Sequence, residues 1–349
     1  MQFHSYPEYI SIQDYQKNVE TYKAHLKNID EVLGLFSMGS ISDPGLSDID
    51  LIVVTKNMVS HGVTLSPFGL NLDRRLFVHD VFVLNLNLAN HFNYIFYPTN
   101  IKPIFVKSGI LIEFQPLHSI SEELKLIYLI ELGKMRLDQL CAISHLQQCN
   151  VRKLITRVSS IVHSLNIADA LAIKIPDNVH AYKDRILSLR DNWTKNQGAS
   201  IQHVDKIFED GLKSWCRIME AASDRLDQID GIVRNEKTVN RKFMNIHFSD
   251  QNRCSLVKDK RGCCQQVLLP KNIYYHYEGY KRPGIGKYRH EQKKRLRFIR
   301  AHRRFLNKTG LTFSMSGNPG IPVNRKEKVN ILIKGLKNFV LRFTQPHIH

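Results

Sequence analysis

The sequence predicts an α+β protein built from three successive parts, and three observations support this. Residues 1–118 mix apolar, β-branched strand patterns with helical periodicity, whereas residues 119–235 carry long apolar stripes at helical spacing. Residues 236–349 are strongly basic. At 349 residues the chain is long enough for two or three domains. We therefore expect domain boundaries near residues 118 and 235.

The first predicted element is a helix that begins after Ser11, a residue type that caps helix N-termini well. Apolar side chains then recur at alternating steps of four and three residues, as one face of a helix requires: Tyr15, Val19, Tyr22, Leu26, Ile29 and Leu33. We expect Gly34 to end this helix and a short strand to follow over residues 35–38.

A turn of small residues and two carboxylates follow that short strand. In the turn, Gly39 lets a phosphate approach the backbone, and Ser40 offers it a hydroxyl and an N–H. Residues 51–54 form an apolar strand, so alternation places Asp48 and Asp50 on one face, about 7 Å apart at Cα. Hard divalent cations such as Mg²⁺ are commonly held by a few carboxylates and a substrate's phosphates. The segment therefore predicts a site for a metal and a triphosphate.

This arrangement resembles the polymerase beta-like nucleotidyltransferase superfamily. The signature of that superfamily is Gly-Ser or Gly-Gly, a short connector and a hydrophobic-flanked Asp-x-Asp, matched here by Gly39-Ser40 and Asp48-Ile49-Asp50. The resemblance covers about residues 11–115. It implies a short mixed sheet flanked by helices. It also implies transfer of a nucleoside monophosphate from an NTP, with ATP expected first, to an acceptor hydroxyl or phosphate with release of pyrophosphate.

The same resemblance implies a third carboxylate on a later strand, and the sequence offers two candidates. Asp80 lies within the strand-like run 75–84, and Glu113 lies within the run 109–114. We favour Asp80, because an unpaired carboxylate in the middle of a strand is costly unless a cation or hydrogen-bond donors compensate. Glu113 remains the alternative third ligand.

The resemblance also assigns roles to these residues. Asp48 and Asp50 are expected to hold one Mg²⁺ with the triphosphate, and a second Mg²⁺ that is completed by Asp80. Mn²⁺ is a possible substitute at both positions. Gly39 and Ser40 are the expected nucleotide contacts.

The middle part is predicted to be helical. Ser119 and Glu122 form a possible capping box for a helix that ends near residue 146, with Gly133 as the one gap in its apolar stripe. Further helices are expected over residues 151–170, 179–193 and 201–226. A helical domain after the catalytic core is common in the superfamily.

Charge is distributed unevenly and predicts a polyanionic partner. The last part carries 26 Lys and Arg against 6 Asp and Glu, while the first carries 8 against 11. Residues 281–308 alone hold twelve Lys or Arg and one acid, and a basic amphipathic helix is expected between Lys293 and Leu306. RNA is the first candidate partner. A small anionic acceptor, an anionic membrane surface and a merely solvated basic face remain open.

Cysteine spacing and hydropathy predict a cytoplasmic protein. No secretory leader and no membrane span are expected, and the dispersed cysteines are interpreted as reduced thiols. A zinc site would need ligands at unfamiliar spacing, and we do not favour it: Cys254, Cys263, His247 and His276.

Three functional hypotheses follow. The first is an NTP-dependent enzyme that modifies a small molecule or a polysaccharide precursor, and the second is an enzyme that acts on RNA. The third is a noncatalytic protein that keeps the fold, either an antitoxin-like regulator or a nucleic-acid-binding protein. The convergence of three acids separates the third hypothesis from the other two, and the sequence leaves the acceptor and the oligomeric state open.

Overall fold

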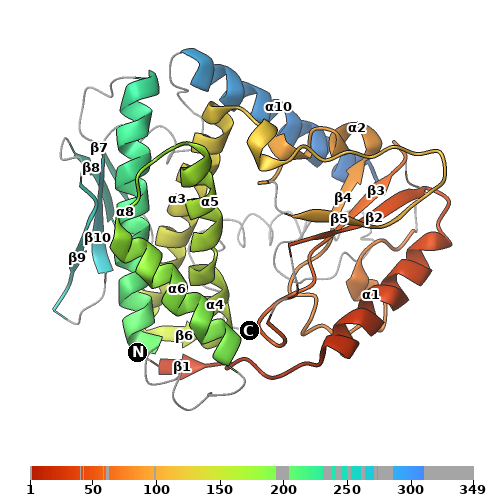
Figure 1. Ribbon diagram of the computed structural model, residues 1–349, viewed down its shortest axis with the longest axis horizontal. Coiled ribbons are helices and arrows are strands. Elements are labelled where there is room, and N and C mark those ends of the chain that lie inside the picture. Colours follow the sequence, from red (N-terminus) through yellow and green to blue (C-terminus); the bar gives the residue numbers. More distant parts are fainter. Residues whose placement is uncertain are drawn as a thin grey trace, which may run out of the picture. The chain divides into compact units, whose positions relative to one another are not determined.

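The computed structural model describes residues 2–39, 41, 43–57, 59, 63–97, 100–193, 204–230, 237–240, 245–249, 253–260, 264–270, 273 and 286–309. These residues form an α+β structure (Figure 1). The chain divides into two compact units, each considered by itself below. The sheet unit contains Glu8–Ile120 and the described residues from Lys293 onward, and the helical unit contains the N-terminal residues to Pro7 and Ser121–Gln292.

The sheet unit is a four-stranded sheet with helices on two sides. Its strands are β2 (Val32–Met38), β3 (Leu51–Thr55), β4 (Phe82–Asn85) and β5 (Ile101–Val106). Its α-helices are α1 (Ile12–Lys27), α2 (Leu86–Ala89) and the part of α10 (Gly286–Thr309) that follows Gln292. Figure 1 shows α10 on the side of the sheet away from α1. Short 3₁₀ turns lie at Pro67–Gly69, Phe92–Tyr94 and Leu117–Ser119.

The sheet is mixed, with the strand order β4-β3-β2-β5. Strands β3 and β4 are parallel, while β2 is antiparallel to both β3 and β5. The starts of β3 and β4 therefore lie at the same edge, where β2 ends. The expected strand over residues 75–84 is shorter than predicted, since β4 begins only at Phe82, and residues 109–114 form no strand.

The first helix begins as predicted and ends earlier. The Ser11 side chain caps α1 by accepting a hydrogen bond from the N–H of Asp14. The helix stops at Asn28, however, so the prediction that Gly34 ends it is wrong. Gly34 lies inside β2, where a Cβ would come within 3.2 Å of the carbonyl oxygen of Phe105 on the neighbouring strand. Close strand approach, and not helix termination, accounts for this glycine.

The loop before β3 is fixed by buried hydrogen bonds. Tyr15 of α1 donates its hydroxyl hydrogen to the carbonyl of Ser47 and accepts a hydrogen bond from the N–H of Gly45. The N–H of Ser47 donates to the carbonyl of Asp43. Gly45 adopts a φ of +88°, and a Cβ there would lie 1.8 Å from the carbonyl oxygen of Glu8. The approach to the Asp-x-Asp segment is therefore a rigid, tightly packed turn.

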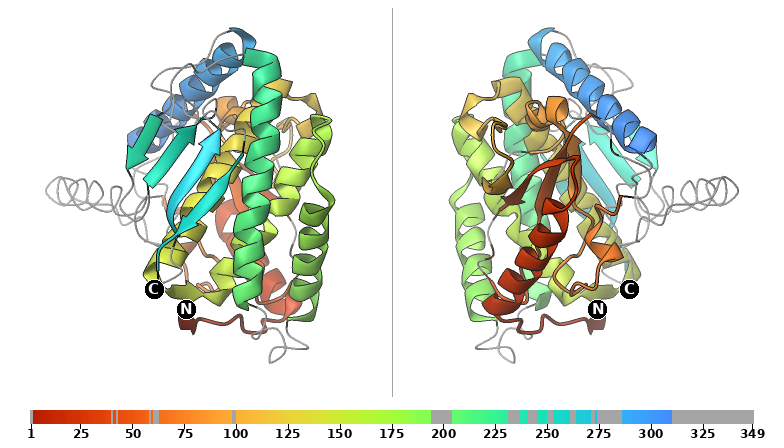
Figure 2. Two further views of the ribbon diagram at one scale, coloured as in Figure 1. Left: turned by 90° about the vertical axis from the view of Figure 1, so that its left-hand side faces the viewer. Right: turned by 90° about the vertical axis from the view of Figure 1, so that its right-hand side faces the viewer.

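The helical unit contains two long neighbouring helices and a second four-stranded sheet. The helices are α3 (Glu122–Leu146), α4 (Val151–Ser159), α5 (Ile161–Ala170), α6 (Asp177–Asn192) and α8 (Val204–Asp230). The sheet has the order β7-β8-β10-β9, from β7 (Lys237–Asn240), β8 (Asn245–Ser249), β9 (Ser255–Lys258) and β10 (Cys264–Pro270). Figure 2 shows this sheet beside α8. Strands β1 (Gln2–His4) and β6 (Gln148–Asn150) form a separate parallel pair.

The predicted helices of this unit are confirmed with changed boundaries. The cap of α3 is Ser121, which accepts from the N–H of Leu124, and not Ser119. The helix expected over residues 151–170 is interrupted at Ser160. Gly133, the gap in the apolar stripe of α3, makes room for Met219 of α8, since a Cβ there would be 2.2 Å from Sδ of Met219.

The described residues of the basic last part are divided between the two units. Strands β7–β10 belong to the helical unit, whereas α10 from Lys293 onward belongs to the sheet unit. Phe305 and Leu306 of α10 are buried in the same apolar core as α1 and strands β2–β4, and Phe298 and Ala301 pack against that core. The helix is therefore a structural part of the sheet unit. Within the described residues, no helix has both the length and the apolarity to cross a bilayer.

The turn at Gly45 leads to a stability prediction. Replacing Gly45 with Ala should lower the free energy of unfolding by roughly 3 kcal/mol or more, because the new Cβ collides with main-chain atoms that cannot move aside. Gly109→Ala is the matched control, since Gly109 also has a positive φ, +76°, but its Cβ would have no atom within 4 Å in the part of the chain that the structure describes. Gly109→Ala should lower the free energy of unfolding by only about 1 kcal/mol. Urea unfolding of both variants measures the difference, and equal costs would contradict the assigned collision.

Candidate metal centre

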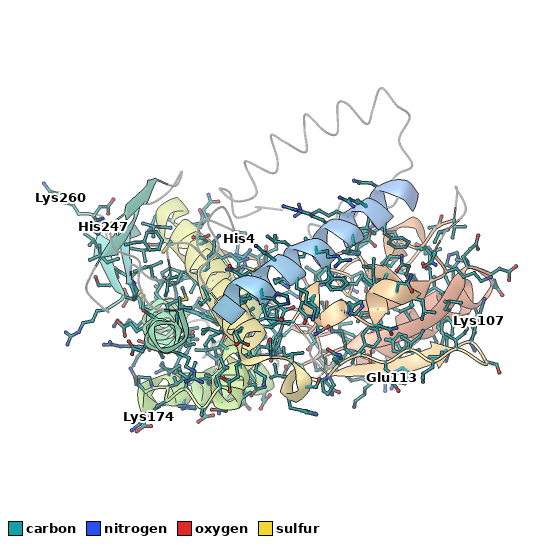
Figure 3. All side chains as sticks on the ribbon, turned by 90° about the horizontal axis from the view of Figure 1, so that it is seen from above. His4, Lys107, Glu113, Lys174, His247 and Lys260 are labelled. Atoms are coloured by element: carbon teal, nitrogen blue, oxygen red, sulfur yellow. The ribbon has the colours of Figure 1, made fainter. Side chains whose placement is uncertain are left out.

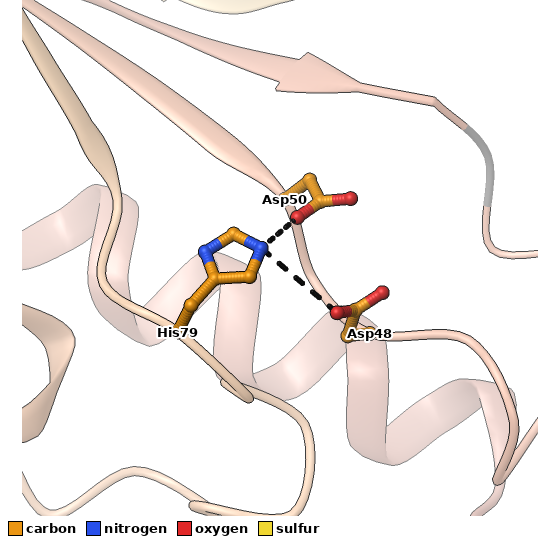
Figure 4. A group of neighbouring side chains, drawn as sticks. All are labelled: Asp48, Asp50 and His79. Atoms are coloured by element: carbon orange, nitrogen blue, oxygen red, sulfur yellow. Dashed lines mark ion pairs between the residues drawn. The ribbon is translucent and has the colours of Figure 1, made fainter. Parts of the chain in front are cut away.

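Two aspartates and one histidine converge in the sheet unit. Each of Asp48, Asp50 and His79 offers one ligand atom, and these atoms all lie within 4.8 Å of one another (Figure 4). Nε2 of His79 is 2.5 Å from Oδ1 of Asp50 and 3.9 Å from Oδ2 of Asp48. The three side chains are between 19% and 29% exposed. The group is thus partly shielded from water and still accessible to a ligand.

The strand arrangement explains this convergence. Asp48 and Asp50 precede β3, and His79 precedes β4, which pairs with β3 in parallel. Backbone hydrogen bonds hold the segment on both sides: the N–H of Met38 donates to the carbonyl of Asp50, and the N–H of Ile49 donates to the carbonyl of Leu76. The two carboxylates lie two residues apart on an extended segment, as the sequence predicted, and therefore face the same side.

The orientation of the His79 ring suits a metal ligand. Its Nδ1 lies 2.7 Å from the carbonyl oxygen of Asp80. A carbonyl oxygen only accepts, so Nδ1 must carry a hydrogen and donate it. In the neutral ring, Nε2 then has the lone pair, and this nitrogen faces Asp48 and Asp50. A ligating histidine usually donates its other N–H to a carbonyl or carboxylate in this way.

The carboxylate of Asp50 is incompletely satisfied. Its Oδ1 atom is buried and has no hydrogen-bond partner of acceptable geometry among the described residues, although Nε2 of His79 lies close to it. A buried carboxylate oxygen without a donor is unfavourable unless a positive charge compensates it. A bound cation would provide that charge, so the donor set fits a metal on this observation.

In the metal-free protein, His79 provides the compensating charge. Burial alone would lower the pKa of His79, but the contact with Asp50 and the negative charges of Asp50 and Asp48 outweigh it and raise the pKa to about 9. At neutral pH the ring is therefore an imidazolium between two carboxylates. A cation bound by the aspartates would take over this role.

Asp80, the third carboxylate that the sequence favoured, does not belong to this group. Its Oδ1 accepts a hydrogen bond from the N–H of Val81, and its carboxylate also accepts one from the side chain of Ser66. Burial raises its pKa, and these two hydrogen bonds oppose the increase. Because β4 begins only at Phe82, Asp80 lies before the strand and not within it. Of the neighbouring residues His79 and Asp80, His79 contributes the ligand atom that lies with the two aspartates.

The other predicted site residues have different outcomes. Glu113, the alternative third ligand, lies on the irregular segment after β5, is exposed and does not belong to the group (Figure 3). Gly39 follows β2 with a φ of +80°, and a Cβ there would meet no atom of the described residues within 4 Å. This glycine therefore leaves open space at the end of β2, next to the strand position that pairs with Asp50. Ser40 lies outside the described residues.

Sequence reasoning missed His79. The signal was its place directly before Asp80, shortly before the strand that pairs with β3, but only the acid of the His79-Asp80 pair was considered as a ligand. The alternative zinc ligands Cys263 and His276 lie outside the described residues. Among residues that the structure does describe, neither Cys254 nor His247 joins a group of three metal-ligand side chains.

A scan against protein-family models finds no match, and neither does a search of curated proteins or of solved structures. The residues of the site therefore carry the functional argument.

The site geometry predicts which substitutions weaken cation binding. Asp50→Asn and His79→Gln should each weaken Mn²⁺ binding about tenfold or more, because the first removes a negative charge at the site and the second removes the imidazole nitrogen. Asp80→Asn and Glu113→Gln are the controls, and they should bind Mn²⁺ nearly as the unaltered protein does. Calorimetric titration with Mn²⁺ alone measures this. If Asp80→Asn lost as much Mn²⁺ affinity as Asp50→Asn while its unfolding curve was unchanged, Asp80 would have to be counted among the ligands.

The raised pKa of His79 predicts a pH-dependent stability without metal. The unfolded pKa is about 6.5 and the folded pKa about 9, so protonation favours the folded state. The stabilisation is complete below about pH 6.5, declines with rising pH and is lost above about pH 9. It amounts to on the order of 3 kcal/mol. In urea unfolding with EDTA, the free energy of unfolding of the unaltered protein should therefore exceed that of His79→Gln at pH 6, and this difference should shrink as the pH rises to 9. A difference that is constant from pH 6 to pH 10 would contradict the assignment.

Proposed function

We propose that this protein is a metal-dependent nucleotidyltransferase. It would transfer a nucleoside monophosphate from an NTP, with ATP expected first, to an acceptor hydroxyl or phosphate and release pyrophosphate. The observation that carries this proposal is the convergence of Asp48, Asp50 and His79 at the strand edge where β2 ends at the Gly39 turn. The resemblance of the Gly39-Ser40 and Asp48-Ile49-Asp50 segments to the polymerase beta-like superfamily supports the same conclusion.

The position of Gly39 supports a role in nucleotide binding. Its N–H donates to the carbonyl of Asn100, so the turn is anchored to the segment before β5. The residue before it, Met38, donates its N–H to the carbonyl of Asp50. The Gly39 turn therefore directly follows the residue that is hydrogen-bonded to the main chain of Asp50, and a phosphate chain could approach the backbone there while a cation joins it to the aspartates.

The ligand types favour particular cations. Two carboxylates suit Mg²⁺ and Mn²⁺, and the imidazole nitrogen of His79 shifts the preference from Mg²⁺ toward transition-metal cations, of which Mn²⁺ also accepts carboxylate ligands. When bound, the cation would neutralise triphosphate charge and lower the pKa of the acceptor hydroxyl. The chain itself would hold the cation through Asp48 and Asp50 and orient the His79 ring through the carbonyl of Asp80.

A noncatalytic nucleotide-binding protein is the second candidate, and one observation favours it. Two-metal transfer needs a third carboxylate, but the carboxylate of Asp80 is engaged by Val81 and Ser66, and Glu113 is exposed. The described residues supply ligands for one group only. Under this alternative the protein would bind a nucleotide and cation without turnover, as an antitoxin-like regulator would.

Turnover distinguishes the two candidates. The protein should release pyrophosphate from labelled NTPs with Mn²⁺ or Mg²⁺ in the presence of cell extract as a source of acceptor. Asp48→Asn and Asp50→Asn should reduce the rate at least 100-fold, because each removes one negative charge that holds the cation. Glu113→Gln is the matched carboxylate control and should keep the rate, since Glu113 is exposed and outside the group.

Two other outcomes would decide against the proposal. Turnover by Asp48→Asn and Asp50→Asn at the rate of the unaltered protein would refute the site. Nucleotide and Mn²⁺ binding that depends on Asp50, without pyrophosphate release from any NTP, would favour the noncatalytic candidate.

A further inference from the structure

We propose that the exposed face of α10 is a docking surface for a nucleic-acid strand, which it binds through the strand's phosphates. We call this face the α10 cationic face and define it as Lys293, Arg297, Arg300, Arg303 and Arg304. The inference does not depend on the catalytic proposal, because it rests on a different surface.

The cationic face is regular along the helix. Lys293, Arg297, Arg300 and Arg304 follow one another at steps of four, three and four residues, and all are exposed. Residues at such steps share one side of an α-helix. Arg303 is also exposed and precedes Arg304. The row spans about 16 Å at 1.5 Å per residue, which is close to five steps of a nucleic-acid strand at 3.4 Å.

Packing of the opposite side holds this row outward. Phe305 and Leu306 are buried in the core of the sheet unit, and the ring of Phe298 stacks on Tyr94 with the centroids 5.2 Å apart. Nε2 of His302 lies 2.8 Å from the carbonyl oxygen of Val83 in β4. A carbonyl only accepts, so this nitrogen is the donor. The helix is therefore seated by both apolar and polar contacts.

Not every cation of the helix belongs to the face. Arg295 is 7% exposed and donates from Nη1 to the carbonyl oxygen of Tyr94, 2.8 Å away. The Nζ atom of Lys294 lies 4.4 Å from the centroid of the Tyr94 ring. These two cations attach the helix to the sheet unit, so the basic run separates into anchoring residues and exposed residues.

The exposed cations are not compensated by acids. Within the part of the chain that the structure describes, none of the five forms an ion pair. The only acid of α10 is Glu291, near its start. Closely spaced like charges repel one another, and a polyanion relieves this repulsion while releasing its own counterions.

The composition of the face favours nucleic acid over a membrane surface. An interfacial helix must insert an apolar face into the lipid, but Phe298, Ala301, Phe305 and Leu306 of α10 already pack in or against the core of the sheet unit. The exposed positions from residue 290 to residue 307 are all polar: His290, Lys293, Arg297, Arg300, Arg303, Arg304 and Asn307. Four of the five cations are arginines, whose planar guanidinium groups bind phosphate oxygens in pairs.

Fluorescence anisotropy of the full chain with labelled 20-nucleotide single strands tests this surface. RNA and DNA of the same sequence form the two arms, without NTP, across a range of salt concentrations. With four to five contacted phosphates, the logarithm of affinity should fall with the logarithm of salt at a slope of about −3. Tighter binding of RNA would indicate that ribose is also read, and equal binding would indicate phosphate contacts alone; both support the proposal.

Charge reversal identifies the residues. The triple variant Arg297→Glu, Arg300→Glu, Arg304→Glu should bind at least 100-fold more weakly and should lower the salt slope by about 2. The matched control reverses three exposed lysines elsewhere on the sheet unit: Lys17→Glu, Lys27→Glu and Lys102→Glu. This control has the same net charge as the α10 variant, and its affinity for the oligonucleotides should fall less than tenfold. Unfolding curves should be nearly unchanged in both, because the altered side chains are exposed.

Three outcomes would overturn the proposal. One is unchanged oligonucleotide binding in the α10 variant, and another is an equal loss in the lysine control, which would indicate net charge alone. The third is binding of the chain to phosphatidylglycerol vesicles without binding to either oligonucleotide. Asp50→Asn should bind the oligonucleotides normally, so a failure of the catalytic proposal is distinguishable from a failure of this one.

Discussion

Parallel pairing of β3 with β4 is the constraint on which the candidate site depends. Parallel strands begin at one edge of a sheet, so the residues that precede them meet even though nearly thirty residues separate them. The antiparallel partner β2 ends at the same edge and adds the Gly39 turn. Carboxylates, an imidazole and an open backbone turn thus come together without any one loop containing them all, and α1 fixes the approach through Tyr15.

Local signals predicted part of this arrangement well. The Ser11 cap, the apolar run of β3 and the alternation of Asp48 and Asp50 depend on neighbouring residues only, and the structure confirms them. For the third ligand, Asp80 was weighed against Glu113, and His79 was not considered. Which side chains before β4 lie beside Asp48 and Asp50 depends on where β4 begins and on its pairing with β3, and an apolar run can only suggest both.

The basic run shows a second limit of sequence reasoning. Its amphipathic pattern correctly indicated a helix, but the pattern did not reveal what its apolar side would contact. The partners Tyr94 and Val83 lie about 200 residues earlier in the chain. Charge counted along the sequence therefore grouped Arg295 with Arg297 and Arg300, although one anchors the helix and the others are exposed.

The position of α10 also affects how the protein is made. Strands β2–β5 and helix α1 are complete once residue 120 has left the ribosome, yet their apolar core still lacks Phe305 and Leu306. During synthesis, the surface that contains Tyr94 must wait for some 190 further residues before it is covered. A fragment that ends at the apparent domain boundary would expose that surface permanently, so chain order makes the last described helix a late and necessary step in the folding of the first unit.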